Sequence, residues 1–371
     1  MRILFAGGGT AGHINPAVAV ANFIKEKEEN CEFLFVGTKE GMESTLVPKQ
    51  GFDIKYINIH GFERKLNLRN VKTVFEIFSS VSKAKKIIKE FRPDVVMGTG
   101  GYVTGPVMYA AHSLKIPTLV HESNAYPGVT VRISARFVDV VALGMKEAAL
   151  FLPESKKIEV TGNPIRPSIL SANQFEAKRK LGLDERKVIL IFGGSLGANK
   201  INMAAVDWIS DTVKDGKYQI IMSAGRNNQY TGVMDRFEKN GVNIEKYNHV
   251  RIHEYIYDMD LALNAADLII ARSGSSVSEM TALGKPAILI PSPYVAGNHQ
   301  EHNARAVEAS GGAVVITEEK LSASALNETV NCILSDDEKL RKMSMGAKSI
   351  GICDATDKLY GILKELIEKR R

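Results

Sequence analysis

The sequence has few cysteines and no long apolar run, and both absences narrow the class of protein. Only three cysteines occur among the 371 residues, without a CxxC pair. This excludes a disulfide framework and makes a reducing compartment the simplest setting. No stretch reaches the roughly 20 apolar residues that a membrane-spanning helix needs. The start, MRILFAGGGT, is a short apolar run stopped by glycines, which predicts a first β-strand rather than a signal peptide.

The composition is that of an ordinary soluble globular protein, with 44% hydrophobic and 24% charged residues. A formal net charge of +6 favours anionic partners such as nucleotides, nucleic acid or an acidic membrane surface, without choosing among them. The length predicts two domains.

Short apolar runs alternate with amphipathic stretches, which is the pattern of βα units around parallel sheets. At TGNPIRP, residues 161–167, two prolines and a glycine interrupt the pattern, and we place the domain boundary there, between 1–164 and 165–345. A helix is expected over residues 15–27. The expected strands are 3–6, 32–36, 95–97, 118–120, 138–142, 188–192, 218–223, 268–271 and 287–291.

Both halves open with a strand, a glycine-rich loop and a helix. The loops are GGGTAGH at residues 7–13 and GGSLGA at 193–198. Glycines let the backbone approach a ligand closely, and the helix that follows offers free amides. His13 is a candidate proton acceptor, and the Ser195 hydroxyl suits a phosphate oxygen. The alternative is that both loops are purely structural turns.

A third segment, ARSGSSVSE at residues 271–279, places small residues at a strand end and a carboxylate in the next helix. Its amides suit a diphosphate, and Glu279 suits the paired hydroxyls of a ribose. The alternative for Glu279 is a carboxylate that only stabilises its own helix. His299 and His302 have no third ligand at sensible spacing, so no metal site is predicted.

Seven motifs together resemble those of the MurG family, the bacterial UDP-N-acetylglucosamine transferases that convert lipid I to lipid II. The resemblance implies a GT-B fold, in which two Rossmann-like domains face each other across a deep cleft, with the acceptor on the N-terminal domain and the donor mainly on the C-terminal one. A C-terminal helix, about 346–371, is expected to pack back on the first domain. The motifs, in chain order, are GGGTAGHINPAVAVA, GGYVTGP, HESNAYPG, TGNPIRP, GGSLGA, RSGSSVSE…ALGKPAILIP and NHQEHNA.

The resemblance implies an inverting transfer of N-acetylglucosamine from UDP to the C4 hydroxyl of the muramoyl sugar of lipid I, without a metal or other cofactor. His13 is then the general base, and Tyr102 and Glu122 are partners on the acceptor side, Glu122 as a second catalytic candidate. Ala11 stands where the family often has glycine, and the spacing from Arg272 to Glu279 is one residue shorter than the family pattern. The implied donor-binding residues are Thr10, Ala11, Gly12, Asn124, Arg166, Ser195, Ile256, Gly274, Ser275, Ser276, Glu279 and Gln300.

A lipid acceptor also implies a peripheral position on the cytoplasmic face of the cell membrane, with other cell-wall synthesis proteins as partners and no nucleic acid. Residues 55–92 contain ten basic and three acidic residues, a net of +7. An apolar helical stripe within them can face either the membrane surface or the protein core. The stripe consists of Val71, Val74, Phe75, Phe78 and Val81.

Three other functions fit parts of the same pattern. A diacylglycerol glycosyltransferase and a UDP-N-acetylglucosamine epimerase are enzymes that would use the same fold. A UDP-sugar-binding or membrane scaffold protein without catalytic activity is the third. An epimerase needs acidic residues poised at the sugar ring, whereas this chain offers His13 in its first loop.

Overall fold

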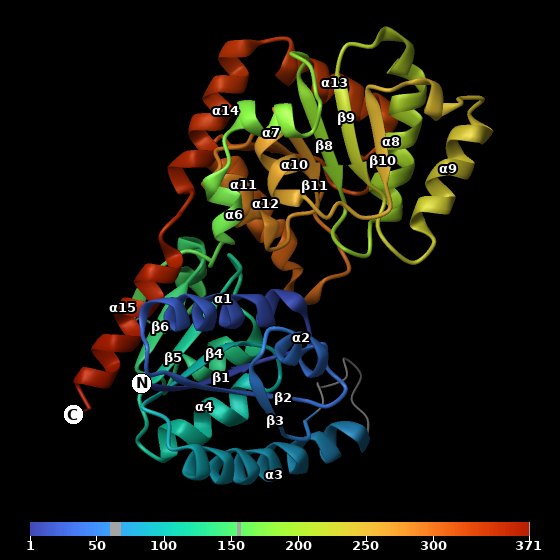
Figure 1. Cartoon of the computed structure of the whole chain (residues 1–371). Coiled ribbons are helices and arrows are strands. Elements are labelled where there is room, and N and C mark those ends of the chain that lie inside the picture. The colour runs from blue at the N-terminus through green and yellow to red at the C-terminus, as the bar shows by residue number, and fades with distance from the viewer. Residues whose placement is uncertain (60–67, 154–156, 371) are drawn as a thin grey trace. The chain divides into compact units, whose positions relative to one another are not determined.

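Two parallel β-sheets organise the chain (Figure 1). The computed structural model describes residues 1–59, 68–153 and 157–370. These residues form two units, the first made of Met1–Ile165 with Cys353–Arg371 and the second of Arg166–Ile352. The predicted boundary after residue 164 lies one residue before the observed division.

The first sheet has seven strands in the order β3-β2-β1-β4-β5-β6-β7. The strand order reverses between β1 and β4, and in open parallel sheets such a switch point is where ligands bind, beyond the carboxyl ends of the strands. The strands are β1 (Arg2–Gly7), β2 (Glu32–Gly37), β3 (Asp53–Tyr56), β4 (Val95–Gly100), β5 (Thr118–Glu122), β6 (Val140–Leu143) and β7 (Lys157–Val160).

The second sheet repeats this topology with six strands in the order β10-β9-β8-β11-β12-β13. Its switch point lies between β8 and β11, which pair in parallel with Phe192 opposite Ala271. The predicted α/β fold with two Rossmann-like halves is confirmed. The strands are β8 (Val188–Phe192), β9 (Gln219–Ser223), β10 (Val250–His253), β11 (Leu268–Ala271), β12 (Ala287–Leu289) and β13 (Ala313–Val315).

Four observed strands were absent from the sequence prediction, and all four are edge strands. They are β3, β7, β10 and β13, at the two ends of each sheet. The residues of β3 alternate between exposed and partly buried, whereas those of β8 are all buried. An edge strand with one neighbour does not need a continuous apolar run, so the apolar pattern that marks the inner strands is missing.

Helices bury their apolar sides against these sheets. The helix predicted over residues 15–27 is found as α1, which begins four residues earlier. The helices of the first unit are α1 (Ala11–Lys27), α2 (Glu43–Lys49), α3 (Leu68–Phe91), α4 (Thr104–Ser113), α5 (Val129–Ser134) and α15 (Ala355–Glu368). In the second unit they are α6 (Pro167–Ser171), α7 (Gln174–Lys180), α8 (Asn199–Thr212), α9 (Gln229–Lys239), α10 (Met259–Ala265), α11 (Ser276–Ala282), α12 (His299–Ala309), α13 (Ala323–Leu334) and α14 (Asp337–Ile350).

The C-terminal helix α15 belongs to the first unit and packs beside α1 (Figure 1). Leu359 and Leu363 are fully buried in the same apolar cluster as Ile14 and Ile24 of α1. Polar contacts border this seam, including an ion pair of 2.7 Å between Lys27 and Asp357. The single helix expected over about 346–371 is in fact two, because the chain leaves helical geometry after Ile350 and passes from one unit to the other.

The basic helix α3 (Leu68–Phe91) contacts the core of the first unit along one side. Ile77, Val81, Ala84 and Ile88, spaced at helical intervals, pack against the core, while Phe78 is 71% exposed. Of the predicted stripe, Val81 therefore contacts the core, whereas Phe78 is exposed. The side chains of Val71, Val74 and Phe75 lie outside the described residues. Among the described helices, none combines the length and apolar character needed to cross a membrane.

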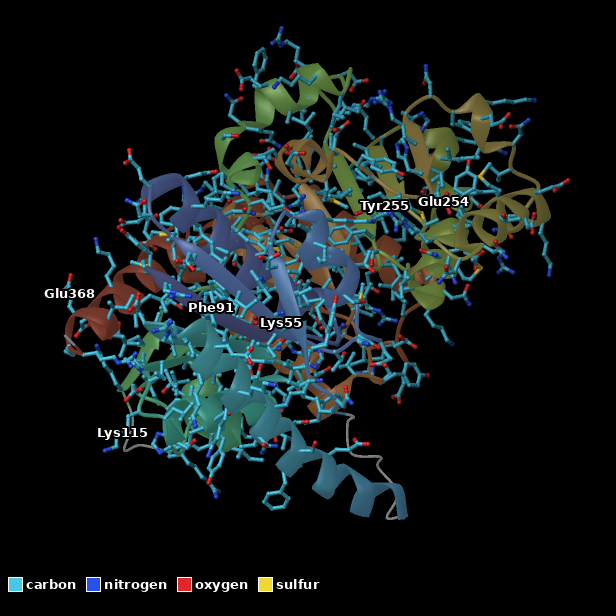
Figure 2. All side chains as sticks on the ribbon, turned by 60° about the horizontal axis from the view of Figure 1, so that its bottom comes forward. Lys55, Phe91, Lys115, Glu254, Tyr255 and Glu368 are labelled. Carbon is cyan, nitrogen blue, oxygen red and sulfur yellow. The ribbon has the colours of Figure 1, made fainter. Side chains whose placement is uncertain are left out.

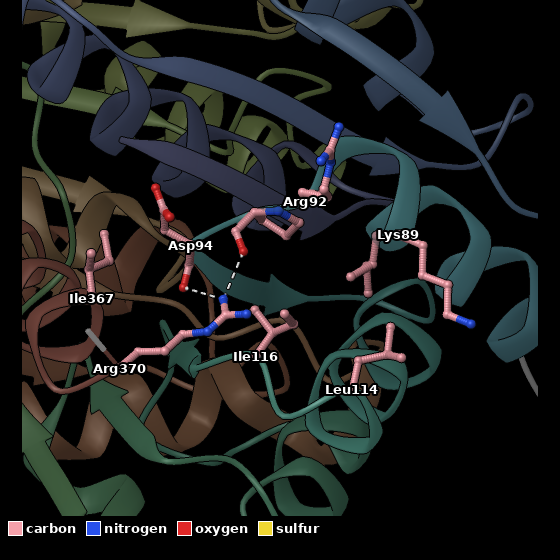
Figure 3. A pocket seen from close by; sticks show the side chains of 9 residues that line it. Lys89, Arg92, Asp94, Leu114, Ile116, Ile367 and Arg370 are labelled. Atoms are coloured by element: carbon pink, nitrogen blue, oxygen red, sulfur yellow. Dashed lines mark hydrogen bonds between the residues drawn. The ribbon is translucent and has the colours of Figure 1, made fainter.

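A hollow of about 460 Å³ lies at the amino ends of β4 and β5, where α15 ends (Figure 3). Arg370 reaches into it and donates to the carbonyl oxygens of Pro93 and Asp94, at 3.1 and 3.4 Å. Lys89 and Arg92 also line it. The hollow is at the end of the sheet opposite the glycine-rich loops, so it is separate from the candidate site of the first unit.

Candidate active site

The loops that follow β1 and β4 meet at the switch point of the first sheet. Gly101 has a φ of 80°, and a side chain there would clash with the carbonyl oxygen of Gly8. The hydroxyl of Thr99 donates to the carbonyl oxygen of His13 at 2.6 Å. The close backbone approach and this hydrogen bond fix the two loops to each other, which gives the first turn of α1 a defined position.

The His13 ring has its Nδ1 atom toward the backbone. Nδ1 lies 3.0 Å from the carbonyl oxygen of Gly8 and 3.3 Å from the hydroxyl of Thr10. A carbonyl oxygen can only accept, so in the neutral ring Nδ1 carries the hydrogen and donates it. Nε2 then holds the lone pair, and His13, which is partly buried, can accept a proton there.

The other residues predicted around the first loop lie in the same turn or in the neighbouring loop. Thr10 is the extended residue that precedes α1, and its carbonyl oxygen accepts from the His13 N–H at 3.1 Å. Ala11 and Gly12 form the first turn of the helix. Tyr102 follows β4 and is 57% exposed. The structure therefore brings Thr10, Ala11, Gly12 and His13 together, with Tyr102 available to solvent from the loop after β4.

Glu122 and Asn124 form a separate hydrogen-bonded turn after β5. The Glu122 carboxylate accepts from the Asn124 backbone N–H at 2.9 Å, from its side-chain amide at 3.0 Å and from the Gly128 N–H at 2.8 Å. Glu122 is 5% exposed. Because three donors already occupy its oxygens, this carboxylate is suited to holding the turn and Asn124 in place rather than to taking a proton from a substrate.

The neighbouring His121 is completely buried, and burial lowers its pKa to about 4. Its Nε2 lies 3.1 Å from the carbonyl oxygen of Gly162 and donates to it. The unfolded chain takes up a proton below its usual pKa of about 6.5 while the folded protein does not, so acid favours unfolding. We expect His121 to reduce the free energy of unfolding by about 2–3 kcal/mol when the pH falls from 7 to near 4.5, and to have no effect above pH 7.

The variant His121→Gln provides the comparison, because glutamine can still donate to Gly162 but does not titrate. Urea unfolding of the first unit is monitored by hydrogen exchange of the β5 amides at pH 7 and near pH 4.5. The free energy of unfolding should fall less on acidification in the variant than in the wild type. Equal losses in the two proteins would contradict the assignment.

In the second unit, the loops after β8, β9 and β10 lie against one another. Gly197 has a φ of 77° and approaches the carbonyl oxygen of Ala224 so closely that no side chain fits. The N–H of Arg226 donates to the carbonyl oxygen of Ser195 at 3.3 Å, and its guanidinium lies 4.5 Å from the centre of the Tyr255 ring. The side chain of Ser195 is exposed.

The segment after β10 carries the residue predicted to hold the base of the nucleotide. Glu254 and Tyr255 are labelled there in Figure 2. The carbonyl oxygen of Glu254 accepts from the Gly225 N–H at 2.9 Å, which joins this segment to the loop after β9. Ile256 follows and is 9% exposed, so its backbone is held in place by a buried side chain.

Arg166 and Glu279 form an ion pair of 3.5 Å between the start of α6 and the middle of α11. The Arg166 side chain is 55% exposed and that of Glu279 is 22% exposed. Burial raises the pKa of Glu279, and the nearby Arg166 lowers it. The pair therefore joins an exposed cation to a largely buried carboxylate, and both belong to the predicted donor site.

Gly274, Ser275 and Ser276 lie where β11 passes into α11. The amide oxygen of Gln300 accepts from the Ser292 N–H at 2.9 Å, and its backbone carbonyl accepts from the Ser273 hydroxyl at 2.7 Å. Gln300 thus borders the loop that precedes α11. Within residues 1–59, 68–153 and 157–370, no group of three or more His, Cys, Asp or Glu side chains is arranged to hold a metal ion.

Comparisons with known proteins show the family of the chain. Residues 3–143 match the glycosyltransferase family 28 N-terminal domain, and residues 188–359 match the C-terminal domain of the same family. A protein of Acetivibrio thermocellus is 46% identical over all of this chain and 99% of its own length. It is named UDP-N-acetylglucosamine--N-acetylmuramyl-(pentapeptide) pyrophosphoryl-undecaprenol N-acetylglucosamine transferase. The chain belongs to the MurG family.

A solved structure of the family supports the fold assignment. The crystal structure of MurG from Acinetobacter baumannii has a TM-score of 0.81 at 26% identity, and the match covers 98% of this chain and 99% of that one. The predicted GT-B architecture is therefore confirmed. A putative UDP-N-acetylglucosamine 2-epimerase from Listeria monocytogenes, with 99% and 97% covered, has a TM-score of 0.71 at 15% identity, which shows a shared fold and nothing further.

Sequence reasoning missed several residues that shape these loops. Thr99, near the end of β4, and Arg226, in the loop after β9, stand next to glycines, and only the folded structure shows what they touch. Glu43 is fully buried and bonds to the first glycine-rich loop from a distance of 34 residues along the chain. Its local sequence, GMESTL, indicates no more than an acidic residue at a helix start.

Proposed function

We propose that the protein transfers N-acetylglucosamine from UDP-N-acetylglucosamine to the C4 hydroxyl of the N-acetylmuramoyl sugar of lipid I, with inversion at the anomeric carbon, to give lipid II. The observation that carries the proposal is the 46% identity, over the whole chain, to a relative named for this transfer. The site geometry supports it, because His13 offers a lone pair at Nε2 for the acceptor hydroxyl.

In this proposal the second unit binds the donor. Glu279 accepts hydrogen bonds from the ribose, Ile256 holds the uracil through its backbone, and Gln300 bonds a hydroxyl of the sugar. The departing diphosphate is stabilised by Arg166, the Ser195 hydroxyl and the amides of residues 274–276, without a metal or other cofactor. The exposed Arg166 can leave Glu279 for the diphosphate when the donor binds.

On the acceptor side, His13 takes the proton of the attacking hydroxyl as the new glycosidic bond forms. Thr10, Ala11 and Gly12 present backbone to the donor sugar, and Glu122 positions Asn124 beside its N-acetyl group. Tyr102 contacts the acceptor. The work of the protein in this scheme is to bring the two sugars together with the hydroxyl aimed at the anomeric carbon.

A lipid acceptor places the enzyme at the cytoplasmic face of the cell membrane as a peripheral protein, with other cell-wall synthesis proteins nearby. The net charge of +7 in residues 55–92 supports this position, because a basic segment is attracted to anionic lipids. The exposed Phe78 adds an apolar contact on the same helix.

The test is incubation of the full chain with labelled UDP-N-acetylglucosamine and a lipid I analogue in detergent, with EDTA in a parallel sample. We expect label in the lipid product in both samples. Label transferred to diacylglycerol instead, or conversion of the sugar nucleotide to its 2-epimer without transfer, would replace the proposal with one of its rivals. UDP-glucose and UDP-galactose in parallel define the donor.

A further inference from the structure

The carboxylate of Glu43 and the ring of His13 bond to opposite sides of one peptide group. Oε2 of Glu43 accepts from the N–H of Gly9 at 2.9 Å. Nδ1 of His13 donates to the carbonyl oxygen of Gly8 at 3.0 Å. The Gly8 carbonyl and the Gly9 N–H belong to the same planar peptide unit, in which they point in opposite directions. A continuous chain of hydrogen bonds therefore runs from the carboxylate through one peptide to the imidazole.

Glu43 is itself fixed by the protein. It is fully buried as the first residue of α2, and its Oε1 accepts from the N–H of Thr38 at 2.8 Å and from the Thr38 hydroxyl at 2.9 Å. Among the described residues no cation forms an ion pair with it, so N–H and O–H groups supply the partners that a buried carboxylate requires. Side chains at Gly8, Gly37 or Gly41 would clash with it, so the space around the carboxylate is closed.

We propose that Glu43 is a positioning residue for His13 and acts through the peptide group between Gly8 and Gly9. In serine proteases a carboxylate bonds the catalytic histidine directly, selects its tautomer and stabilises the charged ring. Here the carboxylate polarises the intervening amide, which makes the Gly8 carbonyl a stronger acceptor for the Nδ1 hydrogen. The catalytic consequence rests on the proposed role of His13 as general base, whereas the effect on the His13 ring does not.

The test is Glu43→Gln in the full chain. In either orientation of the amide, one oxygen is replaced by an NH₂ group, so a backbone N–H of Gly9 or Thr38 loses its acceptor. We expect a roughly 10–100-fold lower kcat for sugar transfer, with the KM for UDP-N-acetylglucosamine changed less than about threefold, because a small displacement of the base affects chemistry more than donor binding. Glu43→Asp keeps the carboxylate and should recover part of the rate.

A second readout needs no substrate. ¹⁵N NMR of histidine-labelled protein reports which ring nitrogen of His13 carries the hydrogen, and the His13→Gln spectrum assigns its signals. We expect the fraction of neutral ring protonated at Nδ1 to fall in Glu43→Gln. If the His13 tautomer changes in Glu43→Gln but the wild-type protein transfers no sugar, the proposed function is overturned and the coupling between Glu43 and His13 stands.

The matched control is Asp139→Asn. The Asp139 carboxylate accepts from the N–H and the hydroxyl of Thr118 at 2.8 and 2.7 Å, much as Glu43 does from Thr38, but at the amino end of β5. We expect its kcat to stay within about twofold of the wild type. Unchanged His13 signals in Glu43→Gln, or equal losses of kcat in Glu43→Gln and Asp139→Asn, would overturn the proposal. If Glu43→Gln does not fold, Glu43→Asp and Thr38→Val are measured in the same way.

Discussion

Replacement of His13 by glutamine is expected to lower the rate of sugar transfer by roughly 10²–10⁴, the usual contribution of a general base. Glutamine has about the length of histidine, and its NH₂ group can still donate to the Gly8 carbonyl, but it cannot take a proton from the acceptor hydroxyl. The loop geometry should therefore survive while the proton transfer is lost. The measurement is kcat with a soluble lipid I analogue and saturating UDP-N-acetylglucosamine.

Donor affinity separates a catalytic effect from a general one. We expect the Kd for UDP, measured by calorimetry, to change less than about threefold in His13→Gln, since the proposed nucleotide contacts are all in the second unit. The control is His112→Gln, the same substitution at an exposed position in the last turn of α4. A His13→Gln enzyme that keeps its rate within about fivefold would exclude His13 as the base.

The second large effect is expected from Leu363→Ala in α15. Leu363 is fully buried among residues of α1 and the first sheet, and removal of a buried leucine side chain costs about 2–5 kcal/mol. The loss should appear in the first unit. Hydrogen exchange of the α1 amides reports it directly, because α15 covers that helix.

Lys358→Ala serves as the control in the same helix. Lys358 is exposed, and its ion pair of 2.9 Å with Asp354 lies at the surface, where such a pair contributes about 0.5 kcal/mol or less. Exchange in α1 should therefore be nearly unchanged in this variant. If the α1 amides exchanged as slowly in Leu363→Ala as in the wild type, the packing of α15 would not be a source of stability for the first unit.

The inner strands of both sheets could be predicted from the sequence, because a buried strand appears there as a short apolar run. The predicted strands at residues 188–192 and 268–271 match β8 and β11 at both ends, and all their residues are buried. The edge strands β3 and β10 were not predicted, because each has a single neighbour in its sheet and is only partly buried, so its residues form no continuous apolar run. The apolar pattern of a segment therefore predicts the strands that are buried in the core, and it does not predict the edge strands.

The candidate site also contains residues that the sequence predicts and residues that only the folded structure shows. The glycine-rich loops and His13 follow directly from strand ends and are visible in the sequence. Glu43 is not, since its contacts with Gly9 and with Thr38 arise only when two loops and a helix start come together. Phe78 belongs to the same apolar stripe as Val81 but is exposed, because the core contacts α3 along Ile77 and Val81.

The assignment of α15 to the first unit has a consequence for biosynthesis. A ribosome releases residues 1–165 early, but the apolar surface of α1 that Leu359 and Leu363 cover stays open until the whole second unit has been made. Domains generally fold as they emerge, with the N-terminal one first. In this chain the second unit can finish folding while the nascent first unit is still incomplete, so the domain that begins the sequence is the last to close its core.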